Sequence, residues 1–299
     1  NRNVLDAATL AWLHRMKREH EARVKLATSF GPDRRSTVLR MIGNLRGQVV
    51  EIFQDTASTT VLHSGERLPE FTLAYDRHSI EIDLRKIPGE AEGGPDYYRT
   101  AMATIDEVVA GRVREGIARD AIPHLSVFAF ARLPLLVYLG SRLDDTVPTS
   151  IYQRHRATEE WSWPDPTAGA ATFELTVDGA KPADEGLLVL NISGTIHDDE
   201  LPSELSELPT YRITTKGPDP SPDAVDTPEV LQRFEAKVRE LLAHLESTNK
   251  TIRRLHVFAA VPISAAVTLG RTTDPNVHPS LVLYDRVDHS YQQVLEVRP

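Results

Sequence analysis

The sequence of 299 residues contains no cysteine. Disulfide bonds, thiolate metal ligands and cysteine nucleophiles are therefore excluded, and this composition suits a reducing compartment. No uninterrupted apolar run approaches the roughly 20 residues that cross a bilayer, and no segment resembles a secretory signal. The sequence therefore predicts a cytoplasmic protein.

Basic residues are outnumbered by acidic ones. There are 34 Lys and Arg against 43 Asp and Glu, which gives a formal net charge of −9. Binding to duplex DNA over a broad surface requires many phosphates to be neutralised at once, so this balance argues against it. A local basic pocket for a small anionic ligand is still compatible with the composition.

Familiar catalytic motifs are missing as well. The chain has no GxGxxG, GxxxxGK[ST], GxSxG or HExxH pattern. We predict no catalytic residue and no metal site, while activity without such a motif stays open. The acidic run from His197 to Glu200 is interpreted as a solvated loop, because adjacent carboxylates seldom converge on one ion.

What the sequence does contain is one motif written twice. Residues 122–140 read IPHLSVFAFARLPLLVYLG and residues 252–270 read IRRLHVFAAVPISAAVTLG, with a constant shift of 130 positions between identical residues. Each copy has an apolar run of strand composition, a short loop with a proline in or near it, and an apolar segment that ends in Leu-Gly. This order predicts two copies of one strand, loop and helix unit.

The elements expected around each copy repeat in the same order. Strand, excursion, helix, strand, helix and a last strand with tyrosine follow one another in both halves. This alternation indicates an α/β fold of two tandem Rossmann-like halves with mainly parallel sheets flanked by helices. We expect a helical connector at 1–35, the first half at 36–165 and the second half at 166–299. The extended segments expected early in the first half are 37–42, 49–53, 71–75 and 79–84.

These segments resemble the SAVED domain, which is a fusion of two CARF-like subunits. The likeness is carried by the paired IxxLxVFA segments, by residues 43–47 (GNLRG), by residues 190–194 (LNISG) and above all by residues 256–271 (HVFAAVPISAAVTLGR). It extends from about Ser36 to the C-terminus. The resemblance implies a CARF-like fold for each half.

The resemblance also implies a function. SAVED domains of bacterial CBASS anti-phage defence bind a cyclic oligonucleotide made by a cGAS-like nucleotidyltransferase, oligomerise, and switch on a fused effector. We therefore expect an antiviral sensor with a cyclic di- or trinucleotide as activating ligand, no other cofactor, self-association on binding and no membrane partner. Because the chain opens at Asn1 without methionine, we expect a fragment or processed product whose upstream effector is a DNA endonuclease, as in the HNH–SAVED type.

Physical chemistry places a ligand at one end of the expected sheets. Ligands of open α/β sheets collect beyond the carboxyl ends of parallel strands, where helix N-termini offer free N–H groups to anions. The segments at those ends are 43–47, 130–134, 192–197 and 260–264. The predicted ligand-binding residues are Asn44, Arg46, Arg132, Trp161, Trp163, Ser193, Gly194, Thr195, Pro262, Ser264 and Arg271.

The predicted residues supply different chemistry, and each has an ordinary alternative. Arginines and hydroxyls can donate to phosphate, glycine lets the backbone approach it, and an indole can stack on a base for ~1–3 kcal/mol. Alternatively, the glycines turn the chain, the tryptophans pack between domains, and Arg271 only neutralises a helix end. Two other functions also stay open: a ring nuclease that cleaves the cyclic oligonucleotide it binds, and a protein-interaction scaffold.

Overall fold

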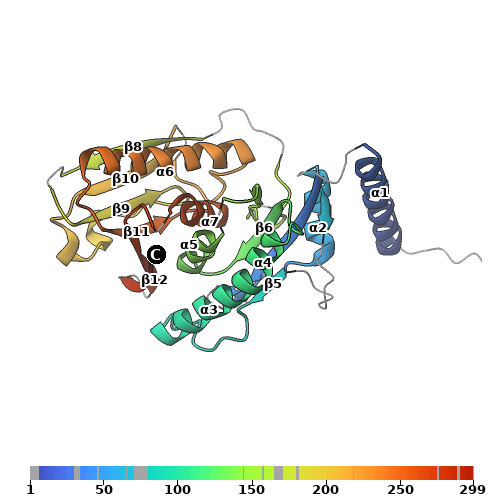
Figure 1. Ribbon diagram of the computed structural model, residues 1–299, viewed down its shortest axis with the longest axis horizontal. Helices are drawn as coiled ribbons and strands as arrows, with labels where there is room; N and C mark the ends of the chain where they lie inside the picture. Colours follow the sequence, from blue (N-terminus) through green and yellow to red (C-terminus); the bar gives the residue numbers. More distant parts are fainter. Residues whose placement is uncertain are drawn as a thin grey trace, which may run out of the picture.

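The structure is a computed structural model, and two α/β lobes in it meet along a pair of helices (Figure 1). It describes residues 7–29, 34–45, 47–64, 66–70, 80–143, 145–156, 158–164, 171–179, 182–217, 219–274, 276–287 and 290–298. The strand expected at 71–75 lies outside the described residues, and so does Arg46. Among the described residues no helix is long and apolar enough to cross a membrane. Helix α1 (Ala7–Ser29) lies at the far end of the first lobe.

The first half is built around strand β1. Its sheet consists of β1 (Arg35–Ile42), β4 (Leu68–Glu70), β5 (Ile80–Asp83), β6 (Leu125–Phe130) and β7 (Thr149–Ile151). Strands β4 and β5 share one edge of β1, β6 occupies the other edge, β7 lies beyond β6, and all pairs are parallel. The strand expected over 49–53 is wrong beyond Val49, because the chain forms a short hairpin of β2 (Asn44–Leu45) and β3 (Gln48–Val49) and then enters a helix.

The second half carries a six-stranded sheet. Its strands are β8 (Thr172–Asp178), β9 (Glu185–Asn191), β10 (Thr210–Lys216), β11 (Arg254–Ala260), β12 (Ser280–Val287) and β13 (Ser290–Val297). Four parallel strands in the order β10-β9-β11-β12 form the centre, and the edge strands β8 and β13 are antiparallel to their neighbours.

The two sheets repeat one plan. The order β5-β1-β6-β7 in the first half corresponds to β10-β9-β11-β12 in the second. Even the bond that closes the central strand pair recurs, because the Gly43 N–H donates to the Phe130 carbonyl at 2.7 Å and the Ile192 N–H to the Ala260 carbonyl at 2.9 Å. The predicted α/β fold of two tandem Rossmann-like halves is confirmed.

Helices cover these sheets and join the halves. The first half has α2 (Gln54–His63), α3 (Pro95–Val108), a π-helical turn η2 (Val109–Arg114), α4 (Glu115–Ala118) and α5 (Leu133–Arg142). The second half has the short 3₁₀ turns η3 (Asp198–Glu200) and η4 (Ser203–Leu205), α6 (Pro228–Thr248) and α7 (Ile263–Thr272). Helices α5 and α7 lie between the two sheets (Figure 1).

The repeated strands form the core of each half. Val127, Phe128, Val257 and Phe258 are all buried, as strands of that apolar composition require. The Phe128 ring stacks on Tyr152 at a centroid distance of 4.5 Å, and Phe258 stacks on Tyr284 at 4.3 Å. The largest apolar cluster runs through both halves, so the division between residues 165 and 166 stays a prediction.

Candidate functional site

Helices α5 and α7 form the joint between the halves, and they touch at two glycines. A Cβ on Gly140 would lie 2.0 Å from the Val267 carbonyl oxygen, and one on Gly270 would lie 1.9 Å from that of Val137. Glycine is therefore needed here for space, because any side chain would separate the two backbones. A shift of 130 positions turns one contact into the other, because Gly140 corresponds to Gly270 and Val137 to Val267. This reciprocity is what an isologous contact between two equal units would have.

Each of these helices is held at its N-terminus by the opposite half. Arg132, which precedes α5, donates from Nη1 to Asp285 Oδ2 at 2.6 Å and from Nε to Glu90 Oε1 at 2.8 Å. In the first turn of α7, Ser264 donates from its backbone N–H and its hydroxyl to Gln153 Oε1, at 3.1 and 2.8 Å. Asp285 directly follows Tyr284 of β12, and Gln153 directly follows Tyr152, the first residue after β7. The two crossed contacts are therefore counterparts.

Arg132 is a fixed cation of this joint. Burial lowers the pKa of its guanidinium, but the hydrogen bond and the charge of Asp285 more than offset that, so the pKa ends above its ordinary value. Its Nη2 also donates to the carbonyl oxygens of Glu90 and Ala91, at 2.5 and 3.3 Å. Since partners within the protein occupy these donors, contact between Arg132 and a phosphate stays a prediction, and it would require this network to rearrange.

The segments predicted at the strand ends lie where parallel pairing places them. Ile42 pairs with Phe130 and Asn191 pairs with Ala260, and the loops that follow continue from the same ends of the strands. The Ser193 N–H also donates to the Ala260 carbonyl at 2.8 Å. The name crown is used below for these described segments, 43–45, 47, 130–134, 192–197 and 260–264.

Side chains shape the crown in both halves. Asn191 Oδ1 accepts the Ile196 N–H at 3.0 Å and so orders the loop that leaves β9. In that loop Ser193 and Gly194 are half-buried and Thr195 is exposed. Asn44 Nδ2 donates to the Arg85 carbonyl at 3.1 Å, while its Oδ1 is buried without a partner. The crown therefore offers free polar groups beside ordered loops.

The acidic run that ends the second crown loop is engaged by arginines. Asp198 forms an ion pair with Arg212, and Glu200 forms one with Arg286 at 2.5 Å. Across the part of the chain that the structure describes, no group of three His, Asp or Glu side chains could hold a metal ion. These carboxylates contribute ion pairs to the loop.

The two neighbouring tryptophans have different surroundings. Trp161 is only 2% exposed, and its ring meets that of Phe128 edge-on at 5.5 Å, which fits the packing alternative rather than contact with a base. Trp163 is half-buried, lies edge-on to His155 at 5.5 Å and lines a cavity between the halves. Pro262, buried, precedes the first turn of α7 and supplies no side-chain cap itself, so the side-chain acceptor at that end is Gln153 of the opposite half.

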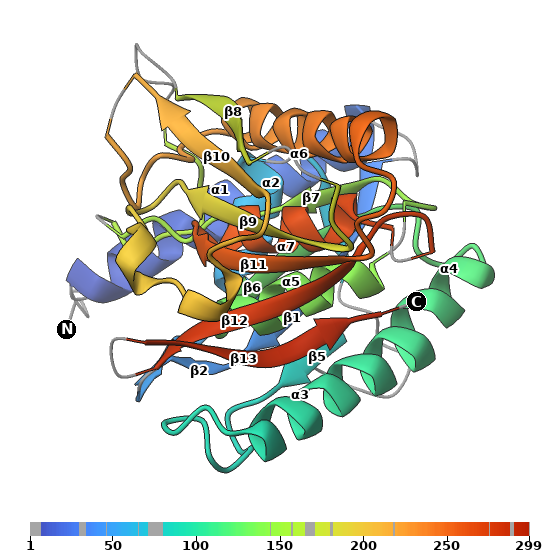
Figure 2. The same cartoon turned by 90° about the vertical axis from the view of Figure 1, so that its left-hand side faces the viewer.

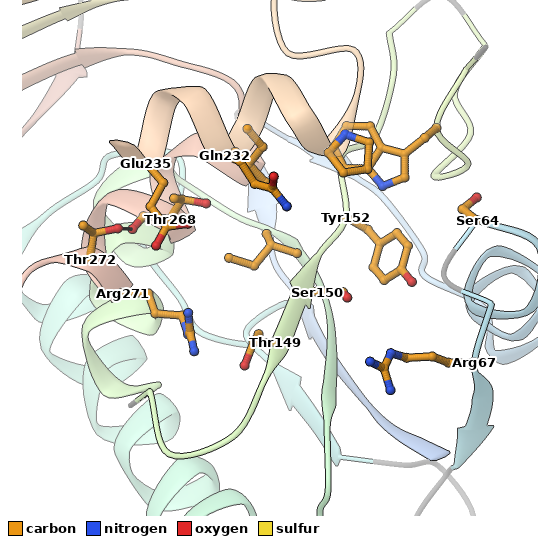
Figure 3. A pocket seen from close by; sticks show the side chains of 14 residues that line it. Ser64, Arg67, Thr149, Ser150, Tyr152, Gln232, Glu235, Thr268, Arg271 and Thr272 are labelled. Carbon is orange, nitrogen blue, oxygen red and sulfur yellow. Dashed lines mark hydrogen bonds between the residues drawn. The ribbon is translucent and has the colours of Figure 1, made fainter. Parts of the chain in front are cut away.

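This interlobe cavity has a volume of 370 Å³ and lies beside β7 (Figure 3). Residues of both halves line it: Ser64, Arg67, Thr149, Ser150, Ile151, Tyr152 and Trp163 from the first, and Pro228, Leu231, Gln232, Glu235, Thr268, Arg271 and Thr272 from the second. Of the residues predicted from the sequence, only Trp163 and Arg271 are among them. No pattern in the sequence pointed to Arg67, whereas Thr268 could have been found because it lies three positions before Arg271 on the same helix face.

Two arginines, Arg67 and Arg271, line the cavity against one carboxylate, that of Glu235. Behind β7 the buried ring of His124 has its pKa lowered to about 4, first by burial and then by the charges of Arg67 and Arg271. Its two ring nitrogens meet the hydroxyls of Ser36 and Ser150 at 2.7 and 3.2 Å. Burial, followed by the charge of Arg34, also lowers the pKa of Arg67. An anion is the charge type that this surface favours.

Comparison with protein families assigns the fold. The family model described as SAVED, the SMODS-associated and fused to various effectors sensor domain, matches residues 105–297. This match covers more than half of the chain. The chain belongs to the SAVED family. The SAVED match begins within α3, includes the joint and spans nearly the whole second half.

Solved structures share this SAVED fold. The Cap4 SAVED/CARF-domain containing receptor of Acinetobacter baumannii with the cyclic trinucleotide 2′3′3′-cAAA has a TM-score of 0.54 and 18% identity, over 76% of this chain and 50% of that one. The structure of this receptor with 3′3′3′-cAAA has a TM-score of 0.54 and 15% identity, over 77% of this chain and 51% of that one. A third structure of the receptor, with no ligand named, has a TM-score of 0.50 and 17% identity, over 77% of this chain and 49% of that one.

The SAVED chain therefore spans about half the length of these receptors, and the likeness at such identities is one of fold. No curated protein matches the sequence. The family and the fold are thus established on separate grounds, whereas neither comparison identifies an effector.

Proposed function

We propose that this SAVED chain is the sensor of a cyclic di- or trinucleotide second messenger in CBASS anti-phage defence. The observation that carries the proposal is the pair of equal halves joined at α5 and α7, in a fold that the Acinetobacter baumannii Cap4 receptor presents with cyclic trinucleotides. A cyclic oligonucleotide repeats the same phosphate and sugar around its ring. A surface that repeats its helix starts and strand ends offers matching groups.

The crown is the proposed binding surface. Helix N-termini and strand carboxyl ends are where α/β proteins hold phosphates, and the crown contains such ends from both halves. Ser193, Thr195 and the unpaired Oδ1 of Asn44, which can only accept a hydrogen bond, are the polar groups proposed to contact the ligand. Arg46 belongs to the same proposal on its sequence position alone, since it lies outside the described residues.

Signalling would use the joint. A ligand shifts an equilibrium only by its differential affinity for the two states, so the bound nucleotide must favour one orientation of the halves or one assembly of the chain. Gln153 and Asp285 reach across the joint to the starts of α7 and α5, so a displacement at the crown is transmitted directly. We propose that binding drives self-association and activates a fused effector, expected to be a DNA endonuclease.

Titration calorimetry with 2′3′3′-cAAA, 3′3′3′-cAAA and a cyclic dinucleotide tests the sensor. We expect at least one of them to bind, and we expect Thr195→Val to weaken that binding about tenfold through the loss of one charge-assisted hydrogen bond. Thr176→Val is the matched control, because Thr176 is exposed on β8, away from the crown.

Sedimentation and chromatography of the same samples separate the alternatives. A larger species with intact ligand supports the sensor. Linear products would indicate a ring nuclease, and absence of binding to all three nucleotides would leave the protein-interaction scaffold.

A further inference from the structure

The two halves differ at the outer edge of their last parallel strand. In the second half, β12 pairs with β11 on one side and with β13 on the other. Strand β13 lies beside α3 and contacts α3 and α5 (Figure 2). In the first half, β7 pairs with β6, and no other strand among the described residues pairs with it. The interlobe cavity lies at this uncovered side of β7, bounded by α6 and α7, which are the counterparts of α3 and α5.

One wall of the cavity presents donors without acceptors. Arg271 donates from Nη2 to the Val147 carbonyl at 3.3 Å, but its Nε is buried and has no partner. Thr268 is 3% exposed, lines the cavity, and its hydroxyl also has no partner. The two residues are three positions apart on α7, so their side chains lie on one face of the helix (Figure 3). Buried polar groups without partners are costly and uncommon in folded proteins.

The rest of the cavity wall fits a phosphate with an attached nucleoside. Arg67 adds a second cation, on the first-half wall beside Ser64 and Tyr152 (Figure 3). The aromatic ring of Trp163, which is half-buried, offers a surface for a base. The only carboxylate among the lining residues is Glu235, which forms an ion pair with Arg239 at 2.7 Å.

We propose that the interlobe cavity binds a nucleoside monophosphate, with the phosphate at Arg271 and Thr268 and the base toward Trp163. Pockets for small ligands range over roughly 300–1,000 Å³, so a cavity of 370 Å³ suits one nucleotide rather than a ring of three. This site is distinct from the crown, and its existence does not depend on the proposed sensing of a cyclic oligonucleotide.

Calorimetry with AMP, adenosine and inorganic phosphate tests the site. AMP should bind about tenfold or more tightly than phosphate, because the base adds stacking, and adenosine should show no measurable binding. Arg271→Gln should weaken AMP binding about tenfold, and Glu235→Gln should strengthen it by removing a like charge. The control is Arg119→Gln, since Arg119 is exposed on the far side of the first half and pairs only with Glu115 among the ion pairs described.

Thr268→Val keeps the test decisive if Arg271→Gln fails to fold. Replacing an unsatisfied hydroxyl by a methyl group of the same shape should leave the melting temperature unchanged or raise it, while AMP affinity falls several-fold. Absence of AMP binding, equal affinity for AMP and phosphate, or an Arg271→Gln variant that binds like Arg119→Gln would overturn the proposal. Because Thr195→Val alters only the crown, AMP affinity unchanged in that variant separates this site from the proposed sensor.

Discussion

The two halves share their joint but not their edges. At the crossing of α5 and α7, Gly140 and Gly270 make the same contact in both directions, and Phe128 and Phe258 stack on equivalent tyrosines. The halves differ at the outer edge of their last parallel strand, because β13 covers β12 whereas a cavity lies beside β7. Duplication thus preserved the contacts that both halves must make together. It left free the surfaces that each half presents alone.

The crossed contacts at the helix starts show the same principle with different chemistry. Asp285 accepts from the charged Arg132, whereas its counterpart Gln153 accepts from the neutral Ser264, which lies two positions beyond Pro262, the residue that corresponds to Arg132. Both tie the start of one helix to the other half. Equivalent geometry therefore does not require equivalent residues, provided that the buried polar groups find partners.

The largest effect is expected at the glycine crossing. Gly140→Ala and Gly270→Ala each place a methyl group within about 2.0 Å of a carbonyl oxygen, so the helices must separate. We expect each variant to lose at least about 4 kcal/mol of unfolding free energy, or to fail to fold. Gly111→Ala is the control, because nothing lies within 4 Å of a Cβ there. If Gly140→Ala and Gly270→Ala both unfolded in urea at the wild-type midpoint, the crossing of α5 and α7 would not require glycine.

Next in size is the pair of core phenylalanines. Phe128 and Phe258 are fully buried in equivalent strands, so truncation to alanine should cost ~3–5 kcal/mol in either half. Phe53→Ala serves as control, since Phe53 is 61% exposed. Chemical denaturation of the two core variants shows whether both halves lose the same unfolding free energy. A gap of more than ~1 kcal/mol would mean that the two strands are not equivalent in energy.

The crossed contacts should differ in strength. Arg132→Met leaves the buried carboxylate of Glu90 without its cation and should cost ~3 kcal/mol. Gln153→Met removes a neutral acceptor from Ser264 and should cost ~1–2 kcal/mol. A double-mutant cycle of Arg132→Met with Asp285→Asn measures the coupling across the joint. A coupling energy near zero would show that this ion pair does not hold the halves together.

The last prediction concerns pH, and it belongs to one half only. His124 corresponds to Arg254 in the second copy of the repeat, so only the first half buries a titratable ring there. The pKa of His124 falls from 6.5 to about 4 on folding, mainly through burial. Below pH 6.5 His124 is therefore protonated in the unfolded chain, whereas in the folded chain it is protonated only below about pH 4. Stability falls as the pH decreases through this window, by ~2 kcal/mol at pH 5.

Thermal unfolding at pH 7 and pH 5 checks this. The variant His124→Gln should lose that part of the pH dependence, while a control at the exposed His20, His20→Gln, should keep it. The pKa of His155 is also lowered by burial, so some dependence of the same sign persists in His124→Gln. An identical pH profile for His124→Gln and the wild type would show that the buried ring is not the source.

Much of the fold could be read from residues whose roles are local. The repeat at 122–140 and 252–270 predicted the strands β6 and β11, the helices α5 and α7, and the burial of Phe128 and Phe258, because apolar periodicity and a closing glycine act along the chain itself. The same residues indicated the SAVED family. Strand composition failed over 49–53, where β3 ends at Val49 and residues 50–53 lead without regular structure into the helix α2.

The candidate sites are less local, and tertiary structure decided them. From the sequence Arg132 and Ser264 looked like free donors at helix starts, but partners more than 100 residues away, Asp285 and Gln153, occupy them. Arg67 stands in no motif, and it lines the interlobe cavity because the fold places it opposite residues of α6 and α7 from the second half. Periodicity and small-residue spacing determine which segments become strands and helices. Which polar groups stay unpaired depends on contacts across the joint, and no sequence pattern encodes those contacts.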